Sequence, residues 1–116
     1  MTDASIVQTL DTRMGELLAA IESHPKMTGS QPHPTGFYIH DFIRNTHNKL
    51  RSIDAQKLQA ADPSTVKEFQ DIRGRNMLTA QLIEGSGPMA QMMLMMGGPI
   101  DFGDAIKQKV REIDSA

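Results

Sequence analysis

The stretch SIVQTLDTRMGELLAAIE, residues 5–22, decides the fold of this chain. Its apolar side chains recur at alternating steps of three and four residues, at Val7, Leu10, Met14, Leu17 and Ile21. Such spacing places side chains on one face of an α-helix, because each turn holds about 3.6 residues. The stretch therefore predicts an amphipathic helix whose apolar stripe packs against other helices, with Asp3 or Ser5 as a cap at its start.

Two further helices are predicted on either side of Asp62-Pro63, because the residue before a proline avoids the helical region. The second helix runs from Phe37 to about Ala61, and its apolar face comprises Ile39, Phe42, Ile43, Thr46, Leu50 and Ile53. The third helix begins with a capping box at Thr65–Glu68, with Pro63 just outside. Its expected apolar set is Val66, Phe69, Ile72, Met77, Leu78, Leu82 and Ile83.

The remaining segments are loops and two shorter apolar stretches. His24–Gly36 holds three prolines and is predicted to be a long loop without helix. Met89–Met96 predicts a short apolar helix or turn, and a last helix is expected to begin near Asp101. The fold class is therefore all-α: a bundle of four or five helices with a long Pro/Gly loop between the first two. We expect a single helical domain over residues 1–116.

Composition narrows the classes of protein. The chain has 116 residues, a net charge of −2 and no cysteine, which argues against general nucleic-acid binding and excludes thiolate chemistry. Residues 1–5 have neither the basic nor the apolar region of a signal peptide, and no apolar run reaches the length of about 18 residues that a membrane span needs. We expect a cytoplasmic protein, or part of a particle assembled from the cytoplasm. We expect it to bind no nucleic acid and to have no membrane span.

Nine methionines are far above ordinary usage, and five of them cluster near the C-terminal end. On a helix, one face would carry Met89, Met92, Met93 and Met96. This face is interpreted either as core filling or as an adaptable surface that binds a partner, because the thioether side chain fits varied apolar shapes. No histidine or cysteine lies nearby to support copper(I) ligation, so neither a metal nor a cofactor is expected.

Steps of four, three and four residues predict a second candidate site, a stripe of His40, Arg44, His47 and Arg51 on the second helix. The stripe is either a solvated polar face or a contact for phosphate or an acidic partner. His40-Asp41-Phe42 resembles the acceptor motif of histidine-kinase dimerisation and phosphotransfer domains. That resemblance implies phosphorylation of His40 with help from the adjacent acid. The loop histidines His24 and His33 are expected to be exposed.

No catalytic motif is present, since the chain has neither a Gly-x-Ser-x-Gly elbow nor a phosphate-binding glycine loop. The run from Asp62-Pro63-Ser64 to Gln70-Asp71-Ile72-Arg73 resembles the helix, break and helix of the short subunits of secretion needles and rods. We therefore predict a non-enzymatic helical interaction or assembly subunit, of the bacterial secretion or phage particle type. Its partner is another protein or a second copy, so an oligomer is expected. The alternatives are a helical chaperone or adaptor that binds a partner helix through the Met-rich surface, and a phosphotransfer module using His40.

Overall fold

The computed structural model describes residues 3–28, 34–84 and 102–116, and nearly all of these residues are helical. The four long helices are α1 (Asp3–Glu22), α3 (Pro34–Arg51), α5 (Pro63–Glu84) and α7 (Asp104–Asp114). Two short helices, α2 (Pro25–Thr28) and α4 (Ala55–Gln59), lie in the connections. The described residues contain no strand, and the predicted all-α bundle is confirmed.

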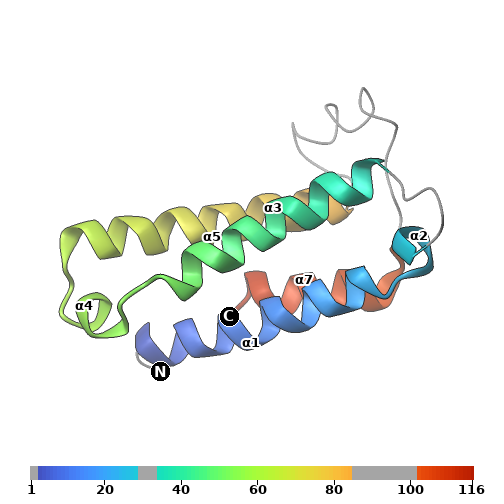
Figure 1. Cartoon of the computed structure of the whole chain (residues 1–116). Helices are drawn as coiled ribbons and strands as arrows, with labels where there is room; N and C mark the ends of the chain where they lie inside the picture. The colour runs from blue at the N-terminus through green and yellow to red at the C-terminus, as the bar shows by residue number, and fades with distance from the viewer. Residues whose placement is uncertain (1–2, 29–33, 85–101) are drawn as a thin grey trace.

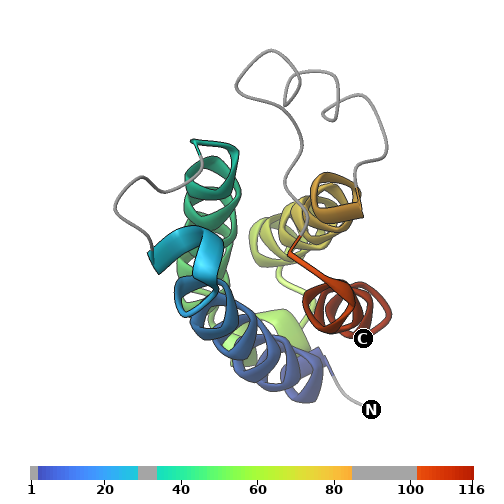
Figure 2. The same cartoon turned by 90° about the vertical axis from the view of Figure 1, so that its right-hand side faces the viewer.

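The four long helices run in alternating directions along the bundle (Figure 1). The view along the bundle shows them as a ring in chain order (Figure 2). In this ring α1 packs against α3 and α7, and α5 packs against the same two helices from the other side. This is an up-and-down four-helix bundle, in which long helices that follow one another in the chain pack as antiparallel neighbours.

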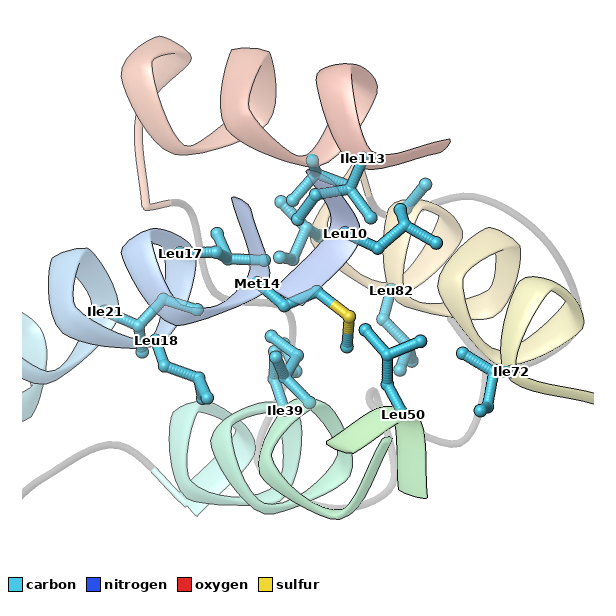
Figure 3. Close-up of a cluster of buried hydrophobic side chains, with 14 of the residues drawn as sticks. Leu10, Met14, Leu17, Leu18, Ile21, Ile39, Leu50, Ile72, Leu82 and Ile113 are labelled. Carbon is cyan, nitrogen blue, oxygen red and sulfur yellow. The ribbon is translucent and has the colours of Figure 1, made fainter. Parts of the chain in front are cut away.

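The core lies where the four apolar stripes face one another (Figure 3). The stripe predicted on α1 is confirmed, since Leu10, Met14, Leu17 and Ile21 are each at most 1% exposed. α3 contributes Ile39, Ile43 and Leu50, and α7 contributes Ile106, Val110 and Ile113. Burial of one such side chain stabilises a fold by about 1.5–3 kcal/mol. The α1 stripe is therefore covered by helices of its own chain.

The prediction of one helix over residues 37–61 is wrong at both ends. α3 begins at Pro34 and ends at Arg51, and the chain turns before α4. Asp54 causes the break, because its side chain accepts hydrogen bonds from the backbone N–H groups of Gln56 at 2.9 Å and Lys57 at 3.2 Å. The turn brings Leu58 into the core with only 2% of its surface exposed.

The start of α5 also differs from the predicted capping box. Asp62, and not Thr65, caps this helix, and Pro63 is its first residue, where a proline has no donor to lose. The Asp62 Oδ2 atom accepts hydrogen bonds from the Thr65 hydroxyl at 2.8 Å and the Thr65 backbone N–H at 3.1 Å. These two bonds, in that order, lower the pKa of Asp62 below its ordinary value of 3.8, with a smaller contribution from the charge of Lys57.

Two other stretches bear on the predicted helix boundaries, the one before α3 and the one before α7. The predicted loop over residues 24–36 contains α2 and the first turn of α3, because prolines at Pro25 and Pro34 fit a first helical turn. α7 begins at Asp104 after Gly103, whose φ of 94° suits a residue without a side chain. The predicted start at Asp101 lies outside the described residues.

We expect Asp62→Ala to lower the melting temperature at neutral pH, because α5 then loses its cap. A carboxylate whose pKa is lowered by folding stabilises the fold above its ordinary pKa, and this stabilisation is lost as pH falls through the folded pKa. The difference between the variant and the parent should therefore shrink as the pH is lowered to about 3 and below. Thermal unfolding followed by circular dichroism across this range measures it. A deficit that stays constant with pH contradicts the assignment of the cap.

Two of the buried polar side chains, Thr46 and Asn76, differ in their hydrogen bonding. The Thr46 hydroxyl is fully buried, donates to the Phe42 carbonyl at 2.8 Å and accepts from Arg75 Nε at 3.0 Å. Asn76 is 4% exposed, and its Nδ2 atom has no hydrogen-bond partner among the described residues. A buried donor without a partner costs about 1–3 kcal/mol, so Asn76 weakens the bundle.

We therefore expect opposite effects on the free energy of unfolding when Asn76 and Thr46 are each replaced by an apolar residue of similar size. Asn76→Leu should raise the free energy of unfolding by about 1 kcal/mol, because the unpaired amide is removed at similar volume. Thr46→Val should lower it by about 1 kcal/mol, because Arg75 Nε loses its acceptor. Urea unfolding measures both changes. If Asn76→Leu destabilises as much as Thr46→Val, the described core packing around α5 is incorrect.

Candidate functional site

The predicted stripe of His40, Arg44, His47 and Arg51 lies on the side of α3 that borders α1. The side chains of both histidines are only 12% exposed, whereas those of Arg44 and Arg51 are 56% and 65% exposed. The interpretation as a solvated face is therefore wrong for the histidines and correct for the arginines. The difference arises because the imidazoles turn toward carboxylates on α1.

His47 is bound to the middle of α1. Its Nε2 atom lies 2.6 Å from Asp11 Oδ1 and 3.1 Å from the Asp11 carbonyl oxygen, so an Nε2–H tautomer donates to α1. Arg51 Nε is 3.8 Å from the same carboxylate oxygen. The ring packs beside Gly15, where an added Cβ would lie 3.8 Å from His47 Cε1. The Asp11 carboxylate of α1 is thus shared by two side chains of α3, those of His47 and Arg51.

His40 is bound to the last residue of α1. Its Nε2 atom lies 2.9 Å from Glu22 Oε1, and its Nδ1 atom lies 3.9 Å from Asp41 Oδ1. Arg44 Nη2 donates to the same Asp41 oxygen at 3.0 Å. The adjacent acid that the phosphotransfer resemblance assigns to His40 is therefore engaged mainly by Arg44. The Nε2 atom of His40 faces the Glu22 carboxylate.

We name the pairs Glu22–His40 and Asp11–His47 the α1–α3 seam. Each pair joins α1 to α3, so the seam adds polar contacts to the packing of these two antiparallel helices. Each histidine has one close carboxylate from the other helix, and the described part of the chain contains no group of three or more potential metal ligands. The geometry of the seam suits a structural role.

Sequence reasoning missed the two α1 carboxylates. Asp11 and Glu22 each directly follow a core residue of α1. This position beside the apolar stripe is the only sign in the sequence that they could face another helix. To recognise them as partners of the histidines one must know that α1 and α3 are antiparallel neighbours.

The expectation that His24 is exposed is wrong. Its Nε2 atom lies 2.9 Å from the Phe102 carbonyl oxygen, and its ring meets the Phe102 ring edge-on with centroids 5.2 Å apart. His24 thus joins the end of α1 to the residues before α7. The other candidates, His33 and the methionines Met89, Met92, Met93 and Met96, lie outside the described residues.

Two exposed apolar side chains, one on α3 and one on α5, were not singled out from the sequence. Met77 was expected to belong to the buried face of its helix, but it is 51% exposed, and Phe37 is 50% exposed. Between the two helices Arg75 stacks over the Phe42 ring, with Cζ 4.7 Å from the centroid. A shallow hollow beside it, the α5 hollow, is lined by Lys49, Gln70, Asp71, Gly74, Arg75, Met77 and Leu78.

No family model matches the chain, and no curated protein or solved structure matches it. Among residues 3–28, 34–84 and 102–116, no helix has both the length and the apolar character required to cross a bilayer. The class that the structure defines is thus an up-and-down four-helix bundle.

A double-mutant cycle on Asp11 and His47 tests the seam. We expect Asp11→Asn and His47→Gln to be coupled by about 0.5–1.5 kcal/mol in the free energy of unfolding, a value discounted because Asp11 is 45% exposed. The matched cycle on Asp41 and Arg44, an exposed pair within α3, should give at most about 0.5 kcal/mol. Denaturant unfolding of the variants measures both couplings. Zero coupling between Asp11 and His47 contradicts the seam.

Proposed function

We propose that this chain is a non-enzymatic helical interaction subunit that binds other protein through the outer surface of α3 and α5. The observation that carries the proposal is the exposure of Phe37 and Met77, each about half exposed. Large apolar side chains elsewhere in the described residues are buried or partly buried. Exposed apolar groups beside charged ones are typical of protein–protein contacts.

The polar groups support the same proposal. His40, His47 and His24, the described side chains best suited to acid–base chemistry, are each bound to another part of the chain. The hollow beside Ile72 is small, with a volume of about 140 Å³, and the α5 hollow is open, unlike the large concave pockets in which substrates are enclosed. These two observations favour a function carried by the outer surface of the bundle. The assembly-subunit type, of secretion or phage particles, rests on the sequence likeness at residues 62–73.

Two alternatives place the function elsewhere. A chaperone or adaptor role would use Met89, Met92, Met93 and Met96, and it rests on the sequence alone. A phosphotransfer role for the Nε2 atom of His40 would require Glu22 to move away, because a carboxylate at 2.9 Å would repel a phosphoryl group. Binding through the outer surface of α3 and α5 needs no such movement of a side chain.

Photo-crosslinking in the native host tests the proposed function. A photoreactive amino acid replaces Phe37 or Met77, and in the control it replaces Gln108, an exposed residue of α7. We expect adducts of defined mass from positions 37 and 77 and none from position 108. Adducts with any protein, including a second copy, support the proposal. The absence of adducts at both surface positions contradicts it.

A further inference from the structure

We draw no further inference here: the strongest candidate, the α5 hollow with its exposed Met77, carries none, because its opposite charges Asp71 and Arg75 lie one helical turn apart on the same helix and nothing in the structure shows what covers this face.

Discussion

Burial of the α1 stripe is the constraint on which the rest of the structure depends. Leu10, Met14, Leu17 and Ile21 are almost completely removed from solvent, and α1 contacts both α3 and α7. In this way α1 closes the ring between α3 and α7. Water exclusion along this stripe therefore determines the cyclic order of the bundle, and the polar contacts are arranged around it.

The placement of α1 explains why the histidines of α3 are hydrogen-bonded to carboxylates in this structure. Once α1 lies antiparallel to α3, Asp11 and Glu22 come within hydrogen-bond distance of His47 and His40. The polar groups next to the core thereby become part of the helix pairing. The large apolar side chains that stay exposed in the described residues are Phe37 on α3 and Met77 on α5.

The parts of the fold that could be predicted are those in which apolar spacing agrees with the core. This holds for α1, and for α7 with Ile106, Val110 and Ile113. It fails on α5, because buried positions are occupied by the polar residues Thr65, Asn76 and Thr79, and the apolar count therefore assigned Met77 to the wrong face.

Helix ends and partners were predicted less well, for two physical reasons. Apolar spacing continues through Ile53 and Leu58, although the Asp54 cap ends one helix and begins another there. At α5 two capping residues compete, and Asp62 before a proline prevails over Thr65. The seam and the α5 hollow each combine two helices, so they follow from the packing and cannot be read from one helix at a time.

Nuclear Overhauser contacts between methyl groups test the central claim most directly. Leu10 and Met14 of α1 should show contacts to methyl groups of α3 and α7 such as those of Ile39 and Ile113, which surround them in the core (Figure 3). A mixture of labelled and unlabelled chains separates contacts within one chain from contacts between chains. The account predicts that these contacts arise within one chain. If they arise only between chains, α1 packs on a neighbour and the bundle described here is not closed by its own first helix.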